Sequence, residues 1–183
     1  MDKFWMKMGT AIQWNDISPN FRPNSFDTYV ATKLLEYEGS PRAVIFFDDV
    51  CDKLTDYSYW FFLGTIWVSY SGKSELQLWK RLFASKRATR LTSIMKPSEL
   101  AIFNTLPNNI LVYRAHRYEE KDWISYTLDQ AIATRFARER KVNEISLYRL
   151  RRRDVIALFL RRGEQEIIML QTERAKLIEK MLL

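Results

Sequence analysis

Cysteine is almost absent from this sequence, which has only Cys51. A single cysteine excludes an internal disulfide framework and a zinc site built from several cysteines. Glycine and proline are also scarce, at five residues each in 183, which argues against long flexible linkers. We therefore expect a folded protein of a reducing compartment, the cytoplasm, without a metal site.

Long apolar runs are missing as well. The longest candidate, residues 59–70, is shorter than the roughly 18 residues of a membrane-spanning helix. The N-terminus has no long apolar core followed by a small-residue cleavage site, so no secretory signal is expected. These features predict a protein that does not act in the membrane.

The chain is instead rich in hydrophobic residues (47%), aromatic residues (14%) and positive charge. This composition predicts one domain, or one domain with an appendage, that buries a substantial core. The net charge of +7 is uneven: residues 111–183 contain 16 Lys and Arg against 11 Asp and Glu, a net of +5. A basic balance favours a polyanion such as nucleic acid as partner, and solubility alone explains it equally well.

Helical periodicity dominates the first 109 residues. A helix is expected from Ser25 as N-cap to the turn at Gly39, and others over 42–54, 57–70, 75–83 and from Pro97. The aromatic residues of 57–70 are interpreted as core, although 65–68 is also β-prone. A run without acidic residues contains Lys80, Arg81, Lys86, Arg87 and Arg90. It is interpreted as a solvated face, with a nucleic-acid contact as the alternative.

From residue 110 onward, short strand-like runs replace the helices. They cover 110–113, 123–127, 144–150, 155–160 and 165–170, with helices predicted over 129–140 and 173–183. The fold class is therefore α+β, with a mostly helical region at 1–109 and a strand-rich region at 110–183.

Two glutamates, Glu164 and Glu166, open the last strand-like run. Alternate residues of a strand share a face, so their carboxylates project together about 7 Å apart. Such a pair can stabilise a cationic sugar and activate a nucleophile. The alternative is a pair of exposed glutamates beside Arg161 and Arg162.

Arg114 follows an apolar strand, and its guanidinium could grip a phosphate or form a structural ion pair. Ser125 and Thr127 alternate on a short strand and could line a pocket or cap the helix that begins at Asp129. His116 is the only histidine and is interpreted as a surface or packing residue.

In this order, Val112-Tyr113-Arg114, Ser125-x-Thr127 before a helix, and Glu164-x-Glu166 before an apolar strand resemble the ADP-ribosyltransferase superfamily, in its Arg–Ser–Glu branch of bacterial toxins and phage enzymes. The resemblance covers about residues 110–170. It implies a split β-sandwich as the catalytic core over 110–183, with the helices of 1–109 packed on it.

The resemblance also implies roles for individual residues. Arg114 would hold the phosphates of NAD, the co-substrate, and Ser125 with Thr127 would build the nicotinamide pocket. Glu166 would bind the ribose 2′-hydroxyl and stabilise the oxocarbenium, while Glu164 would orient the nucleophile. The remaining cofactor-binding residues implied are Tyr113, Tyr126 and Phe136. Ala115 stands where the family often has glycine, and Tyr126 occupies the middle of its Ser-Thr-Ser triplet.

The function implied is mono-ADP-ribosylation of a macromolecule, either protein arginine, from the Glu-x-Glu pair, or nucleic acid, from the basic charge. A toxin of a toxin–antitoxin or phage-defence system, inhibited by a partner protein, fits that class. Two alternatives stay open: an NAD glycohydrolase, in which water is the acceptor, and a non-catalytic module that binds nucleic acid.

Overall fold

The computed structural model describes residues 16–70 and 75–183, and the chain divides into two compact units between Ala101 and Ile102. The division falls eight residues before the boundary expected between 109 and 110.

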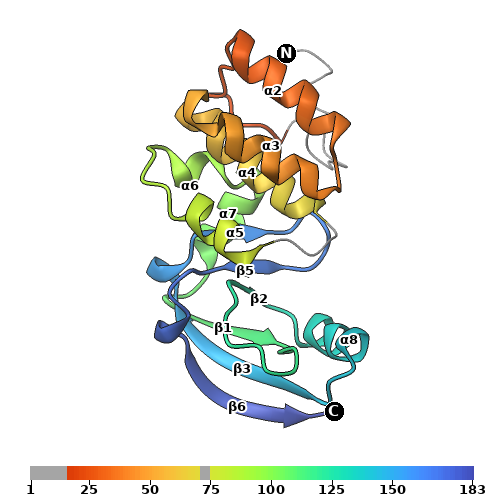
Figure 1. The fold of residues 1–183 in the computed structure, drawn as a ribbon. Coiled ribbons are helices and arrows are strands. Elements are labelled where there is room, and N and C mark those ends of the chain that lie inside the picture. The colour runs from red at the N-terminus through yellow and green to blue at the C-terminus, as the bar shows by residue number, and fades with distance from the viewer. Residues whose placement is uncertain (1–15, 71–74) are drawn as a thin grey trace. The chain divides into compact units, whose positions relative to one another are not determined.

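The first unit is helical (Figure 1). Its helices are α2 (Ser25–Glu36), α3 (Pro41–Val50), α4 (Asp56–Ser69), α5 (Leu76–Phe83) and α6 (Arg90–Ser93), and α7 (Pro97–Thr105) crosses the unit boundary. The N-cap of α2 is Asn24 rather than the predicted Ser25. Asn24 and Asp27 form a capping box, in which each side chain accepts a hydrogen bond from the other residue's main chain.

Helix α4 forms the core of this unit, as its aromatic content predicted. Apolar and aromatic residues cover it on all sides, and ten of its fourteen residues are buried. Trp60, Phe62 and Leu63 have no exposed surface. Aromatic contacts bind the helix to its neighbours, such as the edge-to-face pair of Trp67 with Trp79, at 4.9 Å between ring centres.

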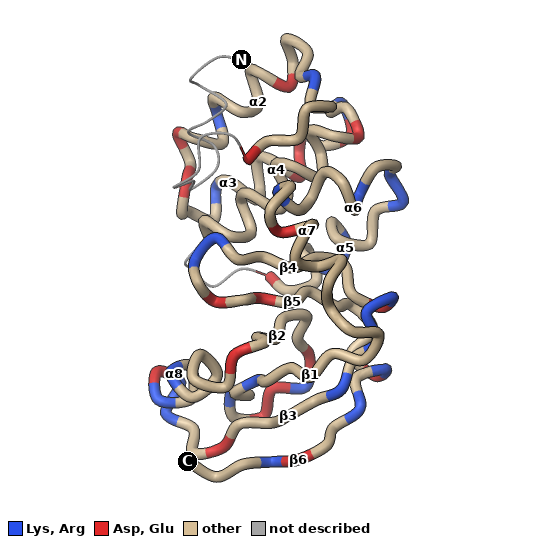
Figure 2. The backbone as a smooth tube through the Cα atoms, turned by 180° about the vertical axis from the view of Figure 1, so that it is seen from behind, with Lys and Arg blue, Asp and Glu red and all other residues tan. Residues whose placement is uncertain are grey.

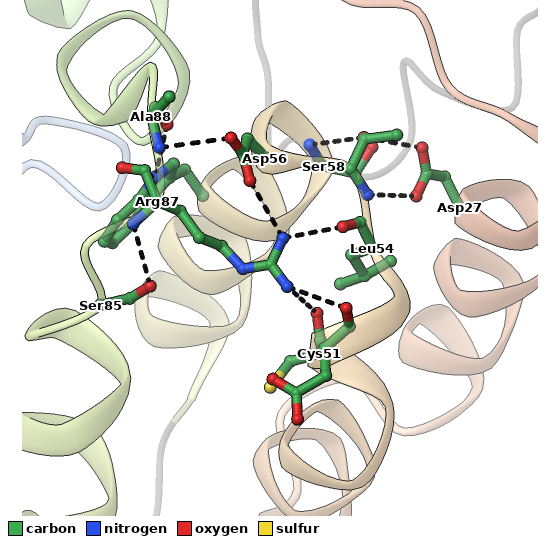
Figure 3. Close-up of polar contacts among 11 residues, drawn as sticks. Asp27, Cys51, Leu54, Asp56, Ser58, Ser85, Arg87 and Ala88 are labelled. Carbon is green, nitrogen blue, oxygen red and sulfur yellow. Dashed lines mark hydrogen bonds and ion pairs between the residues drawn. The ribbon is translucent and has the colours of Figure 1, made fainter.

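Arg87 is an internal anchor of the first unit, so the interpretation of the basic run as a solvated face is wrong at this position. Its guanidinium donates to the carbonyl oxygens of Leu54, Cys51 and Asp52 and to the Asp56 carboxylate, at 2.8 to 3.1 Å (Figure 3). The guanidinium also lies 4.8 Å from the Tyr59 ring centre. One cation thereby satisfies the carbonyl groups between α3 and α4.

Replacing Arg87 with Met should destabilise the protein by roughly 3 kcal/mol, because several charge-assisted hydrogen bonds are lost and their acceptors become unpaired. Chemical denaturation followed by tryptophan fluorescence measures this change. Lys86→Met is the matched control, since Lys86 is exposed and adjacent. Equal losses from the two variants would contradict the anchoring role of Arg87.

The second unit contains a six-stranded antiparallel sheet in the order β4-β5-β2-β1-β3-β6. The α+β class is thereby confirmed. The strands are β1 (Asn109–Arg114), β2 (Ser125–Thr127), β3 (Glu144–Arg151), β4 (Ala157–Phe159), β5 (Glu166–Ile168) and β6 (Lys176–Leu182). A single registered pair, Tyr113 with Thr127, joins β1 to β2. The sheet thus consists of two three-stranded halves that meet at one pair.

Helix α8 (Gln130–Arg140) covers one end of the sheet. Asp129, predicted as the first helical residue, is instead the N-cap and accepts a hydrogen bond from the main chain of Ala131. Its buried side packs Ala133 and Ala137 against Ala115 and Ile145. The small alanines let the helix lie close to the sheet.

The predicted helix over 173–183 is wrong. A short 3₁₀ turn (Thr172–Arg174) leads into β6, which pairs with β3 along the edge of the sheet. Leu177, Ile178, Met181 and Leu182 are spaced as in a helix, which explains the error. Pairing with β3 supplies main-chain hydrogen bonds that outweigh this local pattern.

Across residues 16–70 and 75–183, the structure contains no helix long and apolar enough to span a membrane.

Candidate active site

Three neighbouring strands bring the sequence motifs together. Arg114 ends β1, Ser125 begins β2 and Glu166 begins β5, and β2 lies between the other two. The pairing is antiparallel, with Thr127 opposite Tyr113 on one side and opposite Glu166 on the other. Residues separated by about 50 positions in sequence therefore meet in one part of the sheet.

Arg114 is buried and makes four hydrogen bonds. Its Nε and Nη2 donate to the two carboxylate oxygens of Glu120, at 3.0 and 2.7 Å. Its Nη1 donates to the carbonyl oxygen of Ser125 at 2.6 Å and to the Ser125 hydroxyl at 3.4 Å. The two-point pair with Glu120 neutralises the guanidinium, and the bonds to Ser125 hold the end of β1 to the start of β2.

Glu120 connects this pair to the only histidine. His116 Nδ1 lies 3.0 Å from Glu120, and its Nε2 lies 2.7 Å from the Tyr148 hydroxyl. The Nδ1–H donates to the Glu120 carboxylate, and Nε2 faces the Tyr148 hydroxyl. His116 is partly exposed and packs against the Trp123 ring, in agreement with its prediction as a surface or packing residue. Its ring also joins a chain of polar contacts that the sequence did not predict.

Opposing effects act on the pKa of Glu120. Burial alone would raise it, but hydrogen bonds from His116 and Arg114, together with the Arg114 charge, lower the pKa to about 2. The carboxylate is therefore ionised at neutral pH. Sequence reasoning missed Glu120, because only its placement in the loop after β1 distinguishes it from Glu119.

Aromatic rings surround this polar chain. Trp123 lies edge-to-face against His116 at 4.3 Å, and Tyr126 lies 5.5 Å from Tyr148. The Tyr126 hydroxyl and the Trp123 Nε1 are buried, and neither makes a hydrogen bond of normal geometry with the described residues. Burial raises the pKa of Tyr126 to about 12, although nearby Trp123 counteracts this. Both polar atoms lie in the protein interior.

The Glu-x-Glu segment is fastened to the start of α8. The Thr127 hydroxyl donates to the Glu164 carbonyl oxygen at 2.7 Å and accepts from the Asp129 main chain at 3.1 Å. Arg135 of α8 contacts the Glu164 carboxylate at 3.4 Å. Gln165 between the glutamates has a positive φ of 47°, a conformation that is costly for a residue with a side chain. This strained turn fixes where both carboxylates leave the chain.

Side-chain alternation divides the predicted site between two faces of the sheet. Thr127 and Glu166 are directly paired and share a face, and Ser125 lies on it as well. Arg114 follows Tyr113 and so belongs to the opposite face, with Tyr126. Its contact with Ser125 runs mainly through the main-chain carbonyl at the strand end.

Two residues expected at the cofactor lie in the packing between α8 and the sheet. Tyr113 and Phe136 are half-buried against the cluster of Ala115, Ala133, Ala137 and Ile145. The guanidinium groups of Arg135 and Arg140 also lie 5.0 and 5.2 Å from the Phe136 ring centre. The observed contacts of Tyr113 and Phe136 are those of core residues.

No group of three or more His, Cys, Asp or Glu side chains suited to a metal ion occurs within 16–70 or 75–183. In comparisons with protein families, curated proteins and solved structures, no match to this chain was found.

The depressed pKa of Glu120 predicts a specific dependence of stability on pH. The ionised carboxylate stabilises the fold above its unfolded-state pKa of 4.5, and this contribution is lost as the pH falls from 4.5 towards 2. The shift corresponds to about 3 kcal/mol. Urea denaturation at pH 7, 4.5 and 3 should show that wild type loses more stability with acid than Glu120→Gln does.

Glu119→Gln is the matched control, because Glu119 is the exposed neighbour of Glu120. It should retain the wild-type dependence on pH. At pH 7, Glu120→Gln should be destabilised by about 3–5 kcal/mol, because Arg114 is left as a buried cation without its carboxylate. An equal response of wild type and Glu120→Gln to acid would contradict the ion-pair assignment.

Proposed function

We propose that this protein is an NAD-dependent mono-ADP-ribosyltransferase that acts on a macromolecular target. The observation that carries the proposal is the strand order, because β5, β2 and β1 are neighbours and bear the Glu, Ser and Arg motifs in that order. The division of the sheet into two halves that meet at Tyr113 and Thr127 supports the split β-sandwich of the proposed fold. We propose cytoplasmic activity from the cysteine usage.

The residues present fit NAD as co-substrate at several points. Ser125 and Glu166 are half-buried and share a sheet face, and Glu166 pairs with Thr127, two residues along β2 from Ser125. Arg114 fits less simply, since Glu120 balances its charge. We therefore propose that Arg114 mainly positions β2, and offers a phosphate hydrogen bonds rather than net charge.

NAD supplies a ribose–nicotinamide bond whose cleavage leaves an electron-deficient ribose carbon. Glu166 accepts a hydrogen bond from the ribose 2′-hydroxyl and stabilises the positive charge that develops at this carbon. Glu164, held by Thr127 and Arg135, orients the incoming nucleophile and takes up its proton.

The proposal predicts nicotinamide release from NAD by the wild-type protein in the presence of cell extract. Glu166→Gln should lower this rate by about 100-fold or more, because the carboxylate that stabilises the developing charge becomes neutral. Chromatographic measurement of nicotinamide tests this. Glu179→Gln is the control, since Glu179 is exposed on β6, at the far edge of the sheet from β5.

Glu164→Gln separates transfer from hydrolysis. It should reduce ADP-ribose transfer to the acceptor more than it reduces nicotinamide release, because Glu164 acts on the nucleophile. Nicotinamide release without labelled macromolecule, in every extract, would instead identify a glycohydrolase. A wild-type protein that releases no nicotinamide would refute both enzymatic functions.

A further inference from the structure

A basic groove lies in the second unit, where β3 ends and β6 begins, and it is not used by the site described above. It has a volume of about 630 Å³. Its lining contains five cations and one carboxylate: Arg149, Arg151, Arg153, Arg174, Lys176 and Asp154. Five positive charges against one negative charge leave the groove at +4, in a chain of net charge +7. Figure 2 shows Lys and Arg positions gathering in this region.

Most of these cations have no acidic partner. Arg174 pairs with Asp154 at 3.1 Å, whereas Arg149, Arg151, Arg153 and Lys176 make no ion pair with any residue in the described part of the chain. All five side chains belong to exposed residues. Arg152, in the same sequence run, does not line the groove. Its guanidinium donates to the carbonyl oxygens of Asn104 and Leu106. Four exposed cations of the groove are therefore available to an anionic ligand.

Strand geometry arranges the cations in rows. Arg149 is directly paired with Leu111 of β1 and with Lys176 of β6, and Arg151 is paired with Asn109. Arg149 and Arg151 are two residues apart on β3, so their side chains share a face at about 6.6 Å spacing. This is roughly the separation of consecutive phosphates along one strand of nucleic acid. Arginine forks bind phosphate oxygens in pairs.

The groove also has the right orientation relative to the proposed catalytic carboxylate. Leu111 shares the face of Tyr113, which pairs with Thr127, which in turn pairs with Glu166. Arg149, Arg151 and Lys176 therefore lie on the same sheet face as Glu166. Helix α8 covers only the end of this face around Ala115 and Ile145.

We propose that this basic groove binds the sugar–phosphate backbone of a single-stranded nucleic acid. Three strands at about 4.8 Å spacing make the face about 10 Å wide, which is narrower than a duplex. The exposed Leu111 side chain beside Arg149 gives a base an apolar surface, and Asn109 supplies an amide. A single strand can place its phosphates on the cations and its unpaired bases on Leu111 and Asn109. In a duplex the bases are paired and stacked, so they cannot lie against the sheet face.

The bound strand is also the acceptor of ADP-ribose. This acceptor role rests on the proposed transferase function, whereas binding to the groove does not. Transfer breaks the bond from the ribose carbon to the nicotinamide nitrogen and forms a bond from that carbon to a hydroxyl or amino group of the strand. The proton of that group passes to Glu164 or to water. Nicotinamide leaves with the electron pair of the broken bond.

Binding is tested without NAD, by fluorescence anisotropy with labelled 20-nucleotide RNA, DNA and a duplex of the same sequence. Four phosphate contacts predict a slope of about −2.8 for log affinity against log salt, or about 50-fold weaker binding at 200 mM than at 50 mM salt. Arg149→Glu with Arg151→Glu should weaken binding at least tenfold and reduce the slope by about 1.4. Arg149→Gln with Arg151→Gln should give an intermediate loss.

Arg138→Glu with Lys53→Glu is the matched control, because both residues are exposed cations outside the groove and the change in net charge is the same. This control should bind within threefold of wild type. Equal losses in control and groove variants, or tighter binding of duplex than of single strand, would overturn the groove assignment. Comparison of the RNA and DNA arms identifies which strand is bound.

The acceptor role of the bound strand is tested separately. With labelled NAD, the product should be degraded by RNase or DNase and should resist protease. Label on protein, or no label on a strand that binds the groove, would overturn the acceptor assignment. Because the binding assay contains no NAD, failure of the groove and failure of the transferase function remain distinguishable.

Discussion

The buried ion pair between Arg114 and Glu120 is the interaction on which the candidate site depends. Removing two charges from water costs several kcal/mol for each ion, and only close geometry and further hydrogen bonds offset that cost. Here the Ser125 carbonyl accepts from the arginine, and His116 donates to the glutamate. Arg114 also binds the start of β2 through Ser125, and Glu120 binds the loop after β1 through His116. The pair therefore determines how the loop after β1 lies against β2.

A second constraint acts at the other side of β2. Thr127 is buried, and its hydroxyl holds both the Glu-x-Glu turn and the start of α8. The sequence pattern of alternating hydroxyls indicated a pocket or a cap. The Thr127 hydroxyl contacts the start of α8, whereas the Ser125 hydroxyl contacts Arg114. The buried Thr127 hydroxyl therefore helps to position the segment that carries the Glu164 and Glu166 carboxylates.

Much of the fold could be predicted because its signals are local. Helical periodicity located α2 to α5, and the apolar runs located all strands but one. Strand β6 was missed because six of its seven residues are exposed, so no burial pattern marks it. Glu120 and Tyr148 were missed for a different reason. Their importance arises from the tertiary arrangement around His116, and neither spacing nor composition encodes it.

The role of Arg87 in the first unit also depends on tertiary contacts that the sequence pattern does not indicate. A run of basic residues normally indicates a hydrated surface, yet this guanidinium binds carbonyl groups that sequence cannot reveal as unsatisfied. The carbonyls at the junction of α3 and α4 need donors because the helices end there. Its neighbours Lys86 and Arg81 differ, since Lys86 is exposed and Arg81 pairs with Asp48 on the surface.

The single pair between Tyr113 and Thr127 gives the sheet a seam. Every other junction between neighbouring strands is held by three or more registered pairs, so strain on the sheet concentrates at this seam. Parting it breaks the main-chain hydrogen bonds of one residue pair, at a cost of about 1–3 kcal/mol, and the hydrogen bonds from Arg114 to Ser125. Each half keeps its own ladder intact. The seam is therefore the weakest junction of the sheet, and Arg114 is the side chain that fastens β1 to β2 across it.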